Sequence, residues 1–232
     1  MHLGTKLKYK EAGRWDYNRR MDNNKGYLLV VEDIPDILNL LEATLKFKGY
    51  RVVTANNGED ALAEVAKEQP ALIVADILMP KMDGFSMVHR LRINPETRRI
   101  PVIFLSATYV TPEDKAFALS LGATRFMEKP VDLSTFLPIV ERIFSQGAPA
   151  PSEPMNEFDF YEGYRKRLEI KLTQKNTQIA RDERLIETLP DGEKQAFKKS
   201  MQAAIAEREE IQALLRQIHD RLSELPKPEE KP

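Results

Sequence analysis

Short apolar runs alternate with amphipathic segments throughout residues 26–146. The apolar runs are too short for helices and show no polar alternation. We interpret them as five buried strands, at residues 27–31, 51–55, 71–75, 101–105 and 124–127. Apolar positions at helical spacing follow each strand, as in Leu38, Leu41 and Leu45 after the first. Because strands that are apolar on both faces need cover on both faces, the pattern predicts a doubly wound α/β domain around a five-stranded parallel sheet.

A different pattern occupies residues 157–225, where a turn signal at Pro190 separates two long helical halves. In the second half, apolar residues recur about every 3.5 positions, which is typical of coiled-coil packing. Folding back at the turn would place Lys175 beside Arg208, which is unfavourable because the charges are alike. We therefore keep three alternatives: an intrachain helical hairpin, a four-helix bundle made of two hairpins, and a long helix paired with a second chain.

Apolar side chains beside this seam favour a partner. Leu214, Phe158 and Phe160 would stay exposed on an isolated hairpin, since two helices alone bury little surface. A homodimer formed through residues 157–225 would cover them. Residues 151–232 carry 15 basic and 17 acidic side chains and contain no compact helix-turn-helix pattern, which argues against DNA as the partner.

The remaining segments differ in composition. Residues 1–25 hold seven basic and three acidic side chains and form a basic leader that we expect to be disordered; translation from Met21 would remove most of it. Residues 147–156 form a proline-rich linker, and residues 226–232 a disordered tail. The chain has no cysteine, no apolar secretory region near its start, and no run approaching the ~20 apolar residues of a membrane span. We expect a cytoplasmic protein with no membrane span.

Charged and hydroxyl side chains follow the predicted strands. Glu32 and Asp33 follow the first strand, Asp76 the third, Ser106 the fourth and Lys129 the fifth. Because ligand sites of parallel sheets lie at the carboxyl ends of the strands, these side chains are expected to converge. Clustered carboxylates attract a hard cation such as Mg²⁺, and a carboxylate can also be the nucleophile that becomes an acyl phosphate. The set therefore points to phosphoryl chemistry.

Four motifs in this order resemble the receiver domain of bacterial two-component response regulators. They are Val30-Val-Glu-Asp33, Asp76-Ile-Leu-Met-Pro-Lys-Met-Asp-Gly84, Leu105-Ser-Ala107 and Lys129-Pro130. The resemblance covers about residues 26–146. It implies a flavodoxin-like sheet with strand order 2-1-3-4-5.

The resemblance also implies a metal and a phosphoacceptor. Asp76 would take phosphate from a histidine kinase or a phosphotransfer protein. Mg²⁺ would bind to Asp33 directly, to Glu32 through water, to Asp76, and to the backbone carbonyl of Leu78. Because the Leu78 side chain cannot orient water, we expect the phosphoryl group to be hydrolysed slowly.

Further roles follow for the fourth and fifth strands. Ser106 would be the switch hydroxyl that moves toward the phosphate, and Phe126 the aromatic switch residue. Lys129 would pair with the phosphate, and the bond between Lys129 and Pro130 is expected to be cis.

Several candidate residues have structural interpretations. Asp83 is expected to cap a helix, Met79, Met82 and Met87 to pack, and His89 to lie on a helix surface. His219 could suggest a phosphoaccepting histidine in a kinase-like hairpin, but a solvated helix residue explains it better.

The resemblance leaves the output open. We expect a phosphorylation-controlled adaptor that switches its helical segment, and no catalysis beyond the chain's own phosphotransfer and dephosphorylation. The alternatives are a DNA-binding transcriptional regulator with an unrecognised output, and a phosphorelay intermediate.

Overall fold

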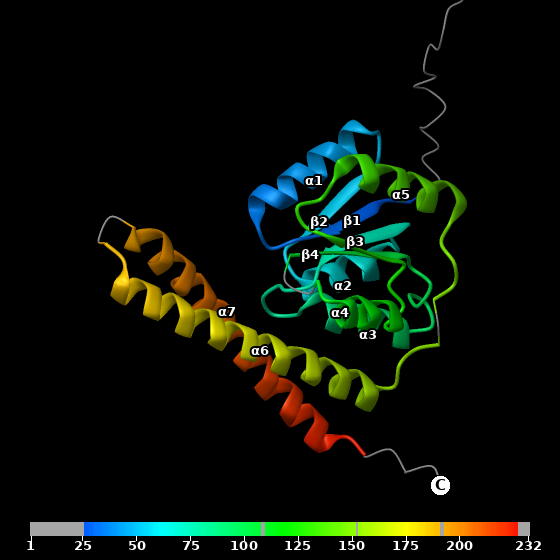
Figure 1. Cartoon of the computed structure of the whole chain (residues 1–232). Coiled ribbons are helices and arrows are strands. Elements are labelled where there is room, and N and C mark those ends of the chain that lie inside the picture. Colours follow the sequence, from blue (N-terminus) through cyan, green and yellow to red (C-terminus); the bar gives the residue numbers. More distant parts are fainter. Residues whose placement is uncertain (1–25, 108–109, 152, 191–192, 227–232) are drawn as a thin grey trace, which may run out of the picture.

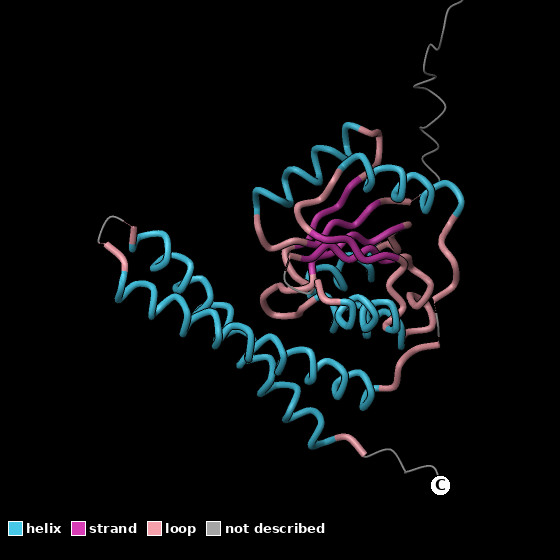
Figure 2. The backbone as a smooth tube through the Cα atoms, viewed as in Figure 1, coloured by secondary structure: helices cyan, strands magenta, loops and turns pink. Residues whose placement is uncertain are grey.

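A computed structural model describes residues 26–107, 110–151, 153–190 and 193–226. Its centre is a five-stranded parallel sheet in the order β2-β1-β3-β4-β5 (Figures 1 and 2). The strands are β1 (Leu28–Val31), β2 (Val52–Ala55), β3 (Leu72–Asp76), β4 (Val102–Ser106) and β5 (Arg125–Glu128). Both the parallel sheet and its strand order confirm the prediction. The basic leader lies outside the described residues, as does all of the tail after residue 226.

Helices cover both faces of the sheet (Figure 1). The connecting helices are α1 (Pro35–Phe47), α2 (Gly58–Lys67), α3 (Gly84–Ile93), α4 (Pro112–Ser120) and α5 (Leu133–Gln146). Buried residues of α1 and α5 share one core with one sheet face, and those of α2, α3 and α4 share a second core with the other. The burial of β1, β3 and β4 on both faces explains why their sequences lack polar alternation.

Local signals fix how the chain leaves the strands. Asp83 caps α3 by accepting a 2.9 Å hydrogen bond from the backbone N–H of Ser86, as predicted. Gly84 follows because a Cβ there would lie 2.3 Å from the carbonyl oxygen of Asp76. The β3–α3 loop can therefore fold tightly against the end of β3. Met79, Met82 and Met87 are buried in the core, also as predicted.

The last two helices form an intrachain hairpin. They are α6 (Glu157–Thr188) and α7 (Lys194–Glu224), which pack along one another (Figure 1). Lys175, which the predicted register places beside Arg208, forms a 2.6 Å ion pair with Glu207. The lysine therefore has an oppositely charged partner on α7.

The hairpin is docked on the α/β domain through α3 and α4. Phe160 and Tyr164 are 1% and 0% exposed, and both belong to the same core as Phe85 and Phe117. The Phe160 ring stacks on His89 with 4.1 Å between ring centroids. Phe160, which was expected to need a partner, is therefore covered by the chain's own α/β domain.

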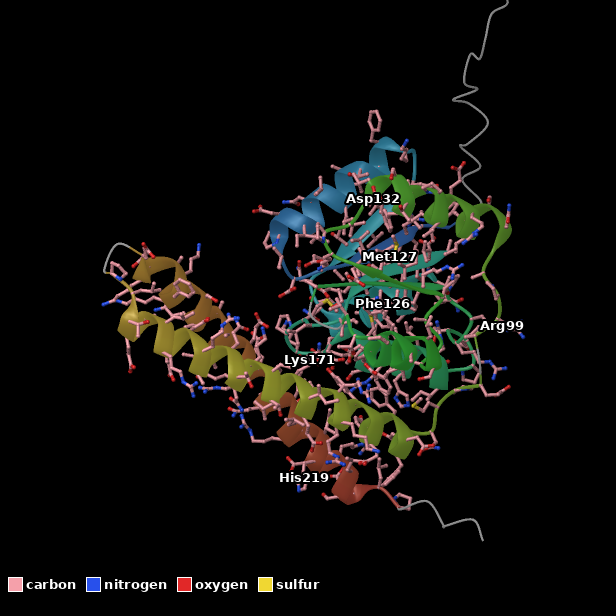
Figure 3. All side chains as sticks on the ribbon, in the orientation of Figure 1. Arg99, Phe126, Met127, Asp132, Lys171 and His219 are labelled. Atoms are coloured by element: carbon pink, nitrogen blue, oxygen red, sulfur yellow. The ribbon has the colours of Figure 1, made fainter. Side chains whose placement is uncertain are left out.

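His89 is not a surface residue, which corrects the prediction. It is 4% exposed, and its Nε2 lies 3.2 Å from the carbonyl oxygen of Met155. Burial lowers the pKa of His89, which keeps the imidazole neutral against Phe160. The helix α3 has a weakly amphipathic sequence because its second side is covered by α6. His219, by contrast, is exposed near the end of α7 (Figure 3).

A buried ion pair lies beside this aromatic cluster. Lys171 of α6 and Asp114 of α4 are 3.2 Å apart, with side chains only 5% and 3% exposed. Figure 3 shows Lys171 at the junction between the hairpin and the α/β domain. Asp114 also closes the capping box at the start of α4 together with Thr111. The pair thus connects α6 directly to the first turn of α4.

Candidate active site

Three carboxylates meet at the carboxyl edge of the sheet. Glu32 and Asp33 follow β1, and Asp76 ends the neighbouring strand β3. Each offers an oxygen within 4.8 Å of the other two. Glu32 is 1% exposed and Asp76 9%, whereas Asp33 lies closer to the surface. The convergence predicted from the strand ends is therefore present.

Lys129 joins two of these carboxylates. Its Nζ lies 2.5 Å from Asp76 Oδ2 and 2.6 Å from Glu32 Oε2, in a side chain that is 9% exposed. Burial disfavours the ammonium, but the charges and hydrogen bonds of Asp76 and Glu32 outweigh it and raise the pKa of Lys129. The peptide bond between Lys129 and Pro130 is cis, as expected. A cation is therefore held against the carboxylate of Asp76.

The carboxylates still carry excess negative charge. Burial raises the pKa of Glu32 and of Asp33, and the charge of Asp76 adds to both shifts. One ammonium does not neutralise three carboxylates, and hard oxygen donors at this spacing suit Mg²⁺. The residues present therefore fit the expected cation, with Asp33, Asp76 and Glu32 as the side chains that would hold it.

Ser106 and Phe126, the residues expected to act as switches, lie on the adjacent strands β4 and β5. Ser106 is fully buried at the end of β4, and its carbonyl accepts a 2.9 Å hydrogen bond from the backbone N–H of Lys129. Phe126 of β5, labelled in Figure 3, is partly buried and pairs in register with Phe104 of β4. Ser106 therefore lies in register with Glu128, the residue before Lys129, and Phe126 lies three residues before Lys129 on the neighbouring strand.

A cavity of about 500 Å³ lies at the carboxylate of Asp76. Asp33, Asp76 and Lys129 line it, and so does Leu78. Glu207 and Glu210 of α7 form another part of its wall. The sequence offered no signal for these two glutamates, because their place depends on the hairpin register and on the docking of α6.

Comparisons with known proteins match the same half of the chain. The model of the response regulator receiver domain matches residues 28–141. The probable transcriptional regulator ycf27 of Pyropia yezoensis is 40% identical over 110 residues, which are 47% of this chain and 44% of that protein. The alkaline phosphatase synthesis transcriptional regulatory protein PhoP of Bacillus subtilis is 32% identical over 168 residues, which are 66% of this chain and 69% of PhoP.

The chain belongs to the response regulator family. The chain spans less than half the length of the ycf27 relative. Its match to the family model covers the receiver domain. Among solved structures, the chemotaxis response regulator CheY4 of Vibrio cholerae is 33% identical with a TM-score of 0.48, covering 51% of this chain and 98% of CheY4. The receiver domain of a signal transduction histidine kinase from Syntrophus aciditrophicus is 33% identical with a TM-score of 0.49, covering 56% of this chain and 98% of that domain.

Within the described ranges, no helix of the receiver or of the hairpin combines the length and the apolar character that a membrane crossing requires. The longest, α6 and α7, are rich in charged residues along their whole length.

Proposed function

We propose that the receiver accepts a phosphoryl group on Asp76 from the phosphohistidine of a histidine kinase or a phosphotransfer protein. An Asp76 oxygen forms a bond to phosphorus while the bond from phosphorus to the histidine nitrogen breaks, and the imidazole leaves with that electron pair. The observation that carries this proposal is the ammonium of Lys129, held 2.5 Å from Asp76 inside a carboxylate cluster.

Each side chain has one task in this reaction. Lys129 stabilises negative charge on the phosphoryl oxygens, and the Ser106 hydroxyl donates a hydrogen bond to one of them. Asp33 and Glu32, with the carbonyl of Leu78, would hold Mg²⁺, which supplies further charge neutralisation when bound. The chain turns over no separate substrate beyond this transfer and the later hydrolysis of its own acyl phosphate.

The helical hairpin is the segment that phosphorylation would switch. It touches the receiver through Lys171 and Asp114, and Asp114 lies in the first turn of α4, the helix that follows β4. A shift of the β4–α4 loop toward a phosphorylated Asp76 would change the surroundings of a buried ion pair, which tolerates little displacement. The hairpin would then present its surface to a partner protein or to a second copy of the chain.

Phosphorylation and the hairpin response can be tested together. The full chain is incubated with acetyl phosphate and Mg²⁺, and the phosphoprotein is separated on a phosphate-affinity gel. Labelling that disappears in Asp76→Asn supports the proposal, and undiminished labelling of that variant would overturn it. Hydrogen exchange of α6 and of the β4–α4 turn, with and without beryllofluoride, then reports whether the hairpin responds. Oligomer mass under the same conditions distinguishes a second copy from a different partner.

A DNA-binding role is the second candidate, because two of the relatives are named as transcriptional regulators. The hairpin offers no compensating basic surface, since residues 151–232 carry 15 basic and 17 acidic side chains. Salt-dependent binding to duplex DNA that strengthens on adding beryllofluoride would favour this candidate over the adaptor.

A further inference from the structure

The hairpin forms part of the wall of the cavity at Asp76. Glu207 and Glu210 of α7 line it together with Asp33, Asp76 and Lys129. A phosphodonor has to reach Asp76 through this space. Part of its wall is therefore supplied by a segment outside the receiver domain.

The hairpin is fixed in this position by several contacts. Glu207 forms a 2.6 Å ion pair with Lys175 of α6, and α6 is held on the receiver by the buried pair of Lys171 and Asp114. The Phe160 ring, 1% exposed, anchors the start of α6. The two glutamates are consequently held at the cavity and do not lie on a free tail.

Glu210 differs from Glu207 in lacking a cation. Within the described part of the chain, no ion pair involves Glu210, whereas Glu207 is paired with Lys175. Glu210 is exposed at the edge of the cavity; partial burial raises its pKa, and the charges of Asp33 and Glu207 add to the shift. A negative charge at this position therefore faces other negative charges across the cavity.

We propose that Glu210 is an electrostatic gate that slows phosphorylation of Asp76 by small anionic phosphodonors. This inference rests on the proposed function of Asp76. An acyl phosphate approaches as an anion, and Glu210 lines the same cavity as Asp76 and Lys129. In the reaction itself, Asp76 forms its bond to phosphorus while the bond from phosphorus to the acyl oxygen breaks and the carboxylate leaves. Glu210 takes no part in that exchange and acts only on the approach.

The test compares two single neutralisations on the same helix. Glu210→Gln removes the charge at the cavity, and Glu209→Gln removes one from an adjacent exposed position outside the cavity wall. Initial rates of labelling by acetyl phosphate are measured on the full chain at saturating Mg²⁺, so that a change in cation affinity does not enter the rate. Glu210→Lys completes a series graded by charge.

The gate predicts a rate increase of roughly three- to tenfold for Glu210→Gln at low salt, the order expected for electrostatic steering. Glu209→Gln should stay near the wild-type rate, Glu210→Lys should exceed Glu210→Gln, and the differences should shrink in high salt. Equal rates for the two neutral variants would overturn the gate while leaving Asp76 as the acceptor. A rate below wild type for Glu210→Gln would also overturn the gate, because Glu210 would then support cation binding at the site. A chain that is never labelled on Asp76 would remove the proposed function and the gate together.

Discussion

Gly163 lies inside α6 where the helix crosses α4, and its replacement by alanine sets two effects against each other. In an isolated helix, alanine is favoured over glycine by about 1 kcal/mol because glycine loses more backbone freedom. In this chain, a Cβ on Gly163 would lie 2.7 Å from Cε2 of Phe117, closer than side chains tolerate. The sign of the change depends on which effect is larger.

The surroundings of Phe117 decide the balance. Its ring is 9% exposed and packs edge-on against Phe85, with centroids 5.2 Å apart, so it has little room to retreat. Overpacking a filled core costs about 1–3 kcal/mol. Subtracting the helix gain leaves a net loss of about 0–2 kcal/mol for Gly163→Ala in the full chain.

A double-mutant cycle isolates the clash from the helix effect. Phe117→Leu shortens the side chain at the contact, so Gly163→Ala in that background should stabilise the protein by up to about 1 kcal/mol. Free energies of unfolding are measured by urea titration followed by far-ultraviolet circular dichroism for the wild type, both single variants and the double variant. The reasoning fails if Gly163→Ala stabilises the wild-type chain, or if its effect is the same in both backgrounds, because α6 would then not press on Phe117.

Three further predictions concern the interface and the acyl phosphate. Lys171→Met should lower the free energy of unfolding in urea by about 3–5 kcal/mol, because it leaves Asp114 as a buried charge without its lysine, and adding Asp114→Asn should recover part of the loss. A loss below about 1 kcal/mol, the range of surface ion pairs, would contradict this. Burial lowers the pKa of His89 in the folded chain, while Glu157 raises it and Arg90 lowers it. The contribution of neutral His89 to stability is therefore complete above a pH of about 6.5 and is lost as the pH falls. Between neutral and acidic pH, the free energy of unfolding of His89→Phe should fall less than that of the wild type, with a difference of at most about 1.4 kcal/mol per pH unit. The acyl phosphate should persist for minutes or longer in purified protein because Leu78 cannot orient water, and a lifetime of seconds on a phosphate-affinity gel would contradict this.

The α/β domain was predictable because its signals are local. Each apolar run carries its own strand, and a residue placed just after a strand is brought to the same edge by the parallel sheet. Glu32, Asp33, Asp76 and Lys129 could therefore be grouped without any knowledge of loop conformations, and the structure places them together. The strand ends fix both the fold and the position of the chemistry.

The interface between the hairpin and the receiver was not predictable in the same way. His89 lies on a helix whose sequence suggests one buried side, and only the arrival of Phe160 buries its other side. Phe160 itself was correctly singled out as needing cover, but nothing near it in sequence names the covering surface. Contacts between elements far apart in the chain depend on orientation, which a periodic pattern does not encode.

The hairpin register carries this limit into the site. A repeat of about 3.5 residues locates a seam but leaves open which residue of one helix faces which residue of the other. Lys175 was expected beside Arg208 but is paired with Glu207, one position earlier in α7. The packing of α7 also brings Glu207 and Glu210 to the cavity that Asp76 lines. The charge that a phosphodonor would meet at this receiver therefore depends on helix packing outside the receiver, and sequence motifs within the receiver alone do not reveal it.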